Sequence, residues 1–412
     1  MKTYSLNDIY SKDKIEFQKS RYSAAQKEFE KFFGEKPLRF FSAPGRSEIG
    51  GNHTDHNCGC VLAAGVSLDV IAMAVPTDDG VITVKSEGFP LDEVNINDLS
   101  VSSGDTNTSA ALIRGMADGF SRNGHKIGGF KAYTTSNVLK GSGLSSSAAF
   151  EVLIGTILNG LYNDQLVSDV EIAQIAQYAE NIHFGKPSGL MDQMASSVGS
   201  FITIDFADVK NPVINKINFD FENSGHSLCI VDTKGNHADL TPEYAAIPKE
   251  MKSVAEYFEK NVLREISKEQ LLKNLPQVRE KCGDRAVLRA LHFFDDNERV
   301  RLQAEALNNG DFDSFLKYVN QSGDSSLCWL QNIFAVSNPQ EQGLTVALYL
   351  AKSILDGKGA CRVQGGGFAG TIEAFVPNSV LEKFKSEMEK VFGENSCHIL
   401  TIRPVGGAEV NL

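Results

Sequence analysis

Apolar and polar positions in the N-terminal half of the chain alternate between helical and extended spacing. Residues 12–33 are charged but place Phe17, Tyr22, Ala25 and Phe29 on one side, as an amphipathic helix does. Residues 129–136 alternate instead with the period of two that is typical of a strand. By these criteria we predict helices over 12–33, 110–120, 145–162 and 169–183, strands over 38–44, 81–85, 129–136 and 201–206, and paired strands within 61–76.

The second half of the chain has longer helical segments between fewer strands. We predict helices over about 241–261, 267–275, 284–308, 311–319 and 341–356, and strands over 227–232, 370–376 and 398–403. Helices and strands do not alternate strictly, which favours an α+β fold over a doubly wound parallel sheet. The polar stretch 207–224 separates the two halves, so we predict domains over 1–215 and 216–412.

Composition narrows the functional classes. The chain has 412 residues, which fits two domains, and its net charge of −12 argues against nucleic acid or an anionic membrane as the main partner. An anionic small molecule stays possible, because it needs only a local positive potential. Seven scattered cysteines without a framework fit a reducing compartment, and Cys58 and Cys60 fit small buried residues better than a redox or metal site. We expect a cytoplasmic protein without a membrane-spanning helix.

A glycine- and serine-rich segment precedes the helix predicted over 145–162. It runs through Gly141, Ser142, Gly143, Leu144, Ser145, Ser146 and Ser147. Glycines let the backbone approach a ligand closely, and amide groups at the start of a helix bind anions, phosphate above all. The segment lacks the G-x-x-x-x-G-K-[ST] pattern, so it would be a phosphate site of another kind. The alternative is a loop that only caps the helix.

Two further segments carry candidate chemistry. Asp192 lies between apolar residues, where a carboxylate needs a partner and suits the role of a base, although it could equally be a helix cap. Arg46 could hold a phosphate or orient a carboxylate, or form a structural ion pair. Polar residues crowd positions 52–57, which suits a polyhydroxyl ligand as well as a plain polar loop. A metal site at His53 and His56 is disfavoured, because the neighbouring glycines oppose the helix that such spacing needs.

In combination, these segments resemble the galactokinase family of the superfamily that also contains homoserine, mevalonate and phosphomevalonate kinases (the GHMP kinases). The resemblance rests on Gly45-Arg46 followed by His53-Thr54-Asp55 and Asn57, on Met191-Asp192-Gln193, on Asn297-Glu298-Arg299-Val300, and on Ile402-Arg403-Pro404 with Gly407-Ala408-Glu409. It spans about residues 36–412. It implies a two-domain α+β fold, with the active site between an N-terminal mixed α/β domain and a C-terminal ferredoxin-like domain.

The resemblance also implies roles for individual residues. The activity would be ATP-dependent phosphorylation of the anomeric hydroxyl of galactose, with Mg²⁺ as cofactor. Asp192 would be the base and Arg46 would stabilise the transferring phosphoryl group, while Gly141 to Ser147 would wrap the triphosphate. The remaining implied ligands are Ser146 and Glu180 for Mg²⁺, and Asn52, His53, Asp55, Asp192 and Tyr244 for the sugar. Residues Gly365–Gly367 would pack beside the site.

The sequence departs from the family's signature at the position expected to face the sugar. The usual signature reads Arg-x-Asn-Leu-Ile-Gly-Glu-His-Thr-Asp, and Asn52 stands where the glutamate is usual. His56 and the run Lys186-Pro187-Ser188 also differ from the common pattern. The alternatives are therefore a kinase of a related hexose, uronic acid or hexosamine, a non-catalytic sugar and ATP sensor, or a kinase of a non-sugar alcohol. We expect a monomer or weak oligomer.

Overall fold

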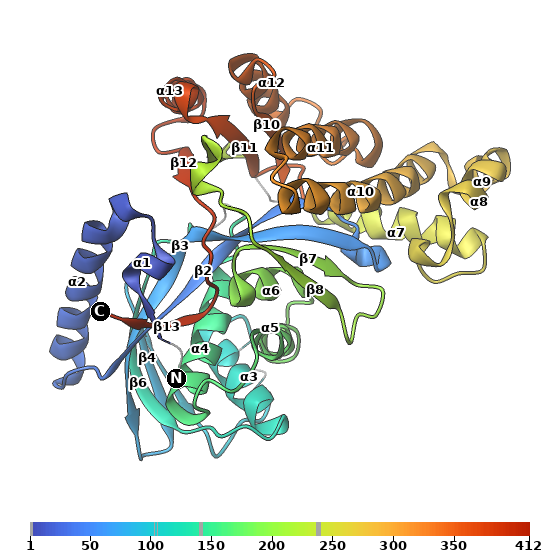
Figure 1. Ribbon diagram of the computed structural model, residues 1–412. Coiled ribbons are helices and arrows are strands. Elements are labelled where there is room, and N and C mark those ends of the chain that lie inside the picture. The colour runs from blue at the N-terminus through green and yellow to red at the C-terminus, as the bar shows by residue number, and fades with distance from the viewer. Residues whose placement is uncertain (1–2, 103, 105, 140–142, 236–239) are drawn as a thin grey trace.

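The computed structural model describes residues 3–102, 104, 106–139, 143–235 and 240–412. Its larger sheet is built around two long antiparallel strands, β2 (Arg39–Gly50) and β3 (Cys60–Thr77) (Figure 1). The strand order is β1 (Thr3–Ser5), β13 (Ala408–Asn411), β2, β3, β6 (Gly129–Ser136), β4 (Val81–Ser86) and β5 (Leu91–Asn95). The first part of β3 pairs also with β7 (Phe201–Asp205), which pairs with β8 (Val213–Ile217).

The alternation of side chains along β3 builds a core on each face of this sheet. Ile71 and Met73 pack against α1 (Leu6–Ile9) and α2 (Ile15–Phe33), whereas Ala72 and Ala74 face α3 (Ser109–Arg122), α4 (Ser146–Tyr162) and α5 (Asp169–Tyr178). Successive residues of a strand point to opposite faces, so a strand covered on both sides reads as a continuous apolar run. This explains the run that the sequence shows over 61–76.

Two predictions for this half are wrong, and one strand was not predicted. Residues 61–76 form one strand rather than a pair, because no turn interrupts the apolar run. The strand predicted to end at Pro44 continues to Gly50, since a bulge between Pro44 and Arg46 accommodates the proline. The polar stretch 207–224 contains the edge strand β8, in which only Ile217 is buried. The larger sheet therefore includes residues up to Ile217 and, through β13, residues 408–411.

The smaller sheet has the antiparallel order β10 (Ala360–Gln364), β11 (Thr371–Pro377), β9 (His226–Asp232) and β12 (Cys397–Leu400). Helices α12 (Gly343–Leu355) and α13 (Leu381–Phe392) pack on one face, and α11 (Phe312–Ser325) packs on the other. The chain order of strand, helix, two strands, helix and strand is that of a ferredoxin-like unit, which confirms the prediction for the C-terminal half. Strand β10 and helix α13 were not predicted.

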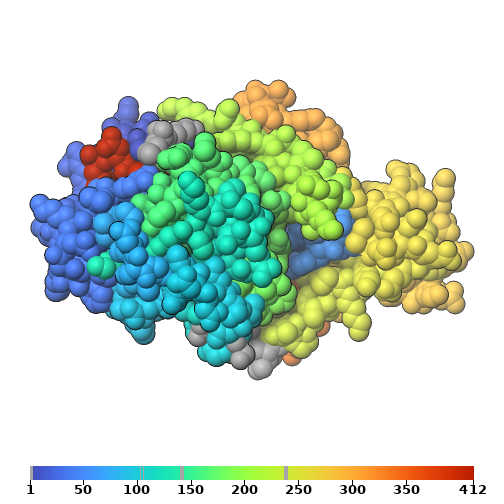
Figure 2. Space-filling view, turned by 90° about the horizontal axis from the view of Figure 1, so that it is seen from below, coloured from blue at the N-terminus to red at the C-terminus, as the bar shows by residue number. Residues whose placement is uncertain are grey.

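A group of helices is inserted between β9 and α12 and projects to one side (Figure 1). It comprises α7 (Thr241–Tyr257), α8 (Lys268–Lys273), α9 (Leu275–Cys282) and α10 (Asp284–Asn308), which share one apolar core. Seen from below, the surface is hollowed between the green atoms of the N-terminal half and the yellow atoms of these helices (Figure 2). In the part of the chain that the structure describes, no helix has the length and apolarity that crossing a membrane requires.

Candidate functional site

Arg46 and Asp192 form the centre of the candidate site. Arg46 follows the bulge in β2, and Asp192 lies in the first turn of α6 (Met191–Val198). The guanidinium donates from Nε to Asp192 Oδ1 at 2.7 Å and from Nη2 to Oδ2 at 2.5 Å, while Nη1 donates to the carbonyl oxygen of Gly143. The arginine side chain is 9% exposed and that of the aspartate 28%. Two residues far apart in sequence thus form a bidentate pair beside the glycine- and serine-rich segment 141–147, called the phosphate segment below.

This pairing determines the charge of Asp192. Burial works to raise the pKa of Asp192, but the charge and hydrogen bonds of Arg46 outweigh it and lower the pKa below the ordinary aspartate value. A hydrogen bond from Ser145 lowers it further. Burial likewise works against the charge of Arg46, yet Asp192 keeps the arginine pKa raised. The site therefore holds an ionised carboxylate at neutral pH, which can accept a proton.

The described part of the phosphate segment leads into helix α4. Gly143 has φ 71°, a left-handed conformation that favours glycine, and a side chain there would meet Gln364. Ser145 is also left-handed, with φ 53°, and directs its hydroxyl to Asp192 instead of capping the helix. The first amide groups of α4 are thereby left for an anion. Gly141 and Ser142, which were predicted to bind ATP with Gly143 to Ser147, lie outside the described residues.

Glu180 is buried in a π-helical turn, Ala179–Phe184, beside the start of α4. Its Oε1 accepts from Lys186 Nζ at 2.8 Å and from Ser147 Oγ at 3.3 Å, and its Oε2 accepts from Gln193 Nε2 at 2.8 Å. The sequence prediction paired Glu180 with Ser146, but Ser147 is the serine that contacts it, because the turn of α4 brings that hydroxyl round to the carboxylate. A carboxylate and a hydroxyl are the oxygen ligands that Mg²⁺ accepts.

A second carboxyl group lies behind Glu180. Glu151 on α4 is buried and accepts from the same Gln193 amide at 3.1 Å. Burial, and then the negative charge of Glu180, raise the pKa of Glu151 well above its ordinary value. Protonation of Glu151 is therefore favoured relative to an exposed glutamate. Gln193 belongs to the motif Met191-Asp192-Gln193, but no role was predicted for it, although it joins both carboxyl groups.

The loop between β2 and β3 carries His53 and Asp55. Thr54 holds the loop together, since its hydroxyl lies 2.8 Å from the carbonyl oxygen of Gly51 and 2.7 Å from that of Cys60. The His53 ring lies 3.0 Å, through Nε2, from the carbonyl oxygen of Gly366, and burial lowers the pKa of this histidine to about 4. His53 is accordingly neutral at pH 7.

Asp55 lies on the opposite side of the loop, against the segment that precedes α6. A Cβ atom added at Gly189 would come 3.0 Å from Asp55 Oδ2, so the carboxylate lies close to the backbone of this segment. The loop thus reaches from Gly366, which His53 contacts, to Gly189, which lies just before the helix that carries Asp192. This is the placement expected of a ligand loop.

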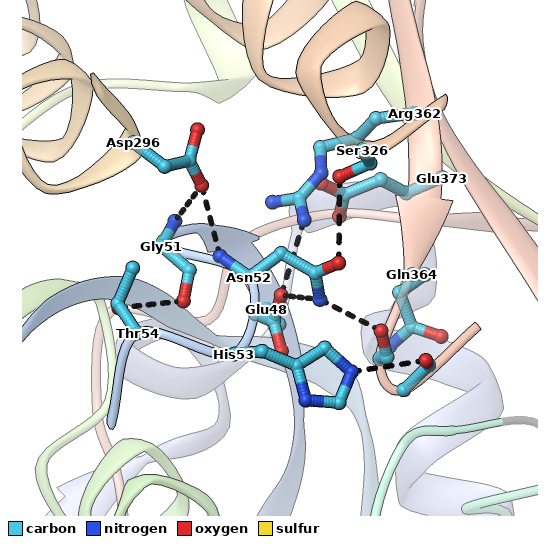
Figure 3. Close-up of polar contacts among 12 residues, drawn as sticks. Glu48, Gly51, Asn52, His53, Thr54, Asp296, Ser326, Arg362, Gln364 and Glu373 are labelled. Atoms are coloured by element: carbon cyan, nitrogen blue, oxygen red, sulfur yellow. Dashed lines mark hydrogen bonds and ion pairs between the residues drawn. The ribbon is translucent and has the colours of Figure 1, made fainter. Parts of the chain in front are cut away.

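Asn52 does not face open space in this structure. Its side chain is buried, and its amide nitrogen donates to Glu48 Oε1 at 2.7 Å and to the carbonyl oxygen of Gly365 at 2.8 Å (Figure 3). Its amide oxygen accepts from Asn332 Nδ2 at 2.8 Å, and its backbone nitrogen donates to Asp296 Oδ2 at 2.9 Å. The expected direct sugar contact would require these bonds to break. Asn52 instead joins the two halves of the molecule.

A buried charged cluster lies next to Asn52. Arg362 on β10 donates to Glu48 Oε1 at 3.1 Å (Figure 3). Glu373 on β11 accepts from Ser47 Oγ at 2.8 Å. Burial raises the pKa of Glu48, and it raises the pKa of Glu373 to about 8, although Arg362 acts in the opposite direction on both. Glu48 and Asn52 stand where the usual signature has asparagine and glutamate. The same two side-chain types are thus present in exchanged order and hydrogen bond to each other.

Residues Gly365–Gly367 form the third glycine-rich segment of the chain, after Gly45–Gly51 and the phosphate segment. They pack against the loop 51–59 and against the helical group. Tyr244 on α7 donates its hydroxyl to the carbonyl oxygen of Gly367 at 2.8 Å, and a side chain at Gly366 would come 2.7 Å from its ring. Asn332 contacts both Asn52 and the carbonyl oxygen of Gly366 at 3.1 Å. The predicted packing of Gly365–Gly367 beside the site is confirmed. Asn332 was missed, since a single asparagine in a loop has no sequence signal.

Gln364 joins this segment to the phosphate segment. Its amide nitrogen donates to the carbonyl oxygen of Gly143 at 2.8 Å, and its amide oxygen accepts from Thr371 at 2.5 Å. Gly143 therefore receives hydrogen bonds from both Arg46 and Gln364. Gln364 was also missed, although it immediately precedes the three glycines. Three glycine-rich segments that are distant in sequence thus meet around the Arg46–Asp192 pair: Gly45–Gly51, the phosphate segment and Gly365–Gly367.

Comparison with known proteins shows which families the chain resembles. Residues 27–76 match the galactokinase galactose-binding signature, and residues 111–200 match the N-terminal domain of GHMP kinases. Galactokinase from Streptomyces coelicolor is 29% identical over 385 residues, which cover 92% of this chain and 96% of that protein.

Solved structures show the same fold. The galactokinase of Lactococcus lactis, solved in complex with galactose, superposes with a TM-score of 0.78 at 23% identity and covers 95% of this chain and 100% of its own. The mevalonate kinase of Methanococcus jannaschii has a TM-score of 0.63 at 14% identity, with 89% and 98% covered. Signature, sequence similarity and fold together show that the chain is similar to galactokinases and has the fold of the GHMP kinases.

Proposed function

We propose that the protein is an ATP-dependent sugar 1-kinase whose substrate is galactose. The single observation that carries this proposal is the bidentate Arg46–Asp192 pair, placed where the phosphate segment, the sugar-signature loop and the third glycine-rich segment meet. The pair supplies an ionised carboxylate for the acceptor hydroxyl and a cation for the phosphoryl group. Phosphoryl transfer needs mainly positioning and electrostatic stabilisation, which such a site can provide.

In the proposed reaction, the anomeric oxygen of the sugar forms a bond to the γ-phosphorus of ATP. The bond from that phosphorus to the β–γ bridging oxygen breaks, and ADP leaves with the electron pair. Asp192 accepts the proton of the anomeric hydroxyl. Arg46 holds Asp192 ionised and stabilises negative charge on the transferring group. His53, Asp55 and Tyr244 would contact the sugar, and the segment up to Ser147 would hold the phosphates.

Glu180 and Ser147 are the residues that fit Mg²⁺, with Ser147 in place of the Ser146 predicted from the sequence. When bound, the ion would neutralise charge on the phosphate oxygens. The chain's own contribution is the fixed orientation of Glu180, which the π-helical turn and Gln193 provide. Asn52 acts in this proposal by positioning the loop that carries His53.

The test is an assay of ADP release with Mg·ATP and a panel of galactose, glucose, N-acetylgalactosamine and galacturonic acid. We expect galactose to give the highest kcat/KM. A higher value for another sugar would assign the substrate to that sugar, and Asn52 would then be the first residue to exchange for glutamate. Sugar and nucleotide binding without turnover of any sugar would contradict a kinase and favour a sensor. Asp192→Asn is the control, and its residual rate defines the background.

A further inference from the structure

Lys186 is a cation in the candidate site that the proposed reaction does not use. It lies in the short segment between the π-helical turn and α6, and its backbone nitrogen donates to the carbonyl oxygen of Glu180 at 3.1 Å. Asn181 fixes the same segment, because its side-chain oxygen accepts from the backbone nitrogen of Ser188 at 2.7 Å. The backbone of Lys186 is therefore held in place while its side chain is 57% exposed.

The ammonium group of Lys186 occupies the entrance to the Glu180 carboxylate. It donates to Glu180 Oε1 at 2.8 Å, and the Glu180 side chain is only 3% exposed. The three ammonium hydrogens of Lys186 can donate to an oxygen acceptor, and Glu180 provides one. The charge of Lys186 also acts on Asp192, where the acceptor hydroxyl is expected.

The two cations near Asp192 differ in their freedom to move. Arg46 is buried, and all three of its nitrogens donate to Asp192 or Gly143. Lys186 has three ammonium hydrogens on a flexible, exposed stem, and Glu180 is the acceptor that holds it. A cation bound at Glu180 would take over the neutralisation of that carboxylate. The freed ammonium would then lie next to the phosphates that such a cation accompanies.

We propose that Lys186 is a catalytic residue that turns from Glu180 to a γ-phosphoryl oxygen of ATP when the nucleotide binds. This inference rests on the proposed function for the identity of the nucleotide. No bond to Lys186 forms or breaks: its ammonium group donates a hydrogen bond to a non-bridging oxygen and stabilises the charge that grows there during transfer. The γ-phosphoryl group is specified because it is the one that approaches Asp192.

The test compares two nucleotides that differ in the γ-phosphoryl group. Calorimetry with Mg²⁺ measures the affinity of AMPPNP, a non-hydrolysable ATP analogue, and of ADP for the wild type, Lys186→Gln and Lys186→Arg. We expect Lys186→Gln to weaken AMPPNP by about 10- to 100-fold, the range for one charged hydrogen bond, and ADP by less than about threefold. Lys186→Arg keeps the charge and should recover most of the AMPPNP affinity.

Lys352→Gln is the matched control. Lys352 is 47% exposed and pairs with Asp324 at 2.5 Å on the C-terminal helices, so its loss removes a comparable ion pair away from the site. Kinetics should show a lower kcat for Lys186→Gln with an unchanged KM for the sugar. Equal losses for AMPPNP and ADP, or no loss for either, would overturn the proposal. Thermal unfolding of each variant verifies that it is folded, and the binding ratio can be read even if no sugar is phosphorylated.

Discussion

The Arg46–Asp192 pair allows the stability of the site and its chemistry to be tested with the same variants. Asp192→Asn keeps the acceptor that faces Arg46 Nε, but its amide NH₂ would face the donor Nη2, now 2.5 Å from Oδ2. One of two charged hydrogen bonds is lost and the buried guanidinium loses its counter-charge. Removal of one partner of a buried ion pair costs about 3–5 kcal/mol. Because Asp192 is 28% exposed, we expect a loss smaller than this range, about 2–3 kcal/mol.

The reciprocal and double variants complete the cycle. Arg46→Met leaves Asp192 without its partner, but the aspartate can still reach water, so we expect a loss of about 1–2 kcal/mol. The double variant contains no unpaired buried charge. We therefore expect its loss in the free energy of unfolding to fall short of the sum of the single losses by about 1–2 kcal/mol. Urea unfolding followed by circular dichroism measures all four proteins.

The turnover number of the same variants tests the catalytic role of the pair. Asp192→Asn should lower kcat by about 10²- to 10⁴-fold, the contribution of a positioned general base, while the affinity for AMPPNP stays within about threefold.

The lowered pKa of Asp192 means that the unfolded chain binds more protons than the folded one in acid. The stability that the pair contributes is therefore present above the ordinary aspartate pKa and lost as the pH falls through the folded value. Additive losses in the cycle, or near-normal turnover of Asp192→Asn, would refute this reasoning.

Three further predictions concern the buried residues behind the site. Glu373 keeps its proton in the folded state up to about pH 8, whereas the unfolded chain releases this proton at a lower pH, so the stability that it contributes should be lost as the pH rises toward 8. The free energy of unfolding of Glu373→Gln relative to the wild type, measured with urea, should therefore rise between pH 5 and 9. A difference that does not change with pH would contradict the raised pKa. Asn52→Ala removes the hydrogen bonds to Glu48 and Gly365 and should lower the free energy of unfolding by about 2–4 kcal/mol. A decrease of less than about 0.5 kcal/mol would show that these bonds do not stabilise the fold. Gly366→Ala should displace the ring of Tyr244, because the new carbon would lie only 2.7 Å from it. We expect the KM for the sugar to rise more than kcat changes. An unchanged KM would exclude the tyrosine from the sugar site.

The sequence was most informative where several signals coincide in a short stretch. Glycines, serines and the start of an apolar helix predicted the described end of the phosphate segment, and the helix begins at Ser146. The ferredoxin-like unit was predicted from the resemblance and is confirmed by its strand order. Strand β8 was missed because an edge strand buries few side chains, so its apolar pattern is weak.

Contacts between distant segments could not be predicted from composition or spacing. Nothing local to Arg46 indicates that it lies against Asp192, 2.5 Å away across the fold. Gln193 and Gln364 were overlooked because an isolated amide has no periodicity, and only the fold shows which carbonyl or carboxylate it meets. Asn52 is the opposite case: the resemblance assigns it to the sugar, whereas its partners in this structure are Glu48, Asn332 and Gly365. Its contact with the sugar stays a prediction.

Strand β13 has a consequence for the order in which the molecule is made. It lies between β1 and β2, so that Thr3 pairs with Glu409 and Phe41 pairs with the same glutamate from the other side. A ribosome that synthesises the chain from its N-terminal side produces β2 long before the residues that complete its edge. Until residues 408–411 emerge, the strand that carries Arg46 presents an open edge to chaperones and to other nascent chains. Closure of this edge of the sheet is thereby linked to the synthesis of residues 408–411, long after the strand that carries Arg46 has been made.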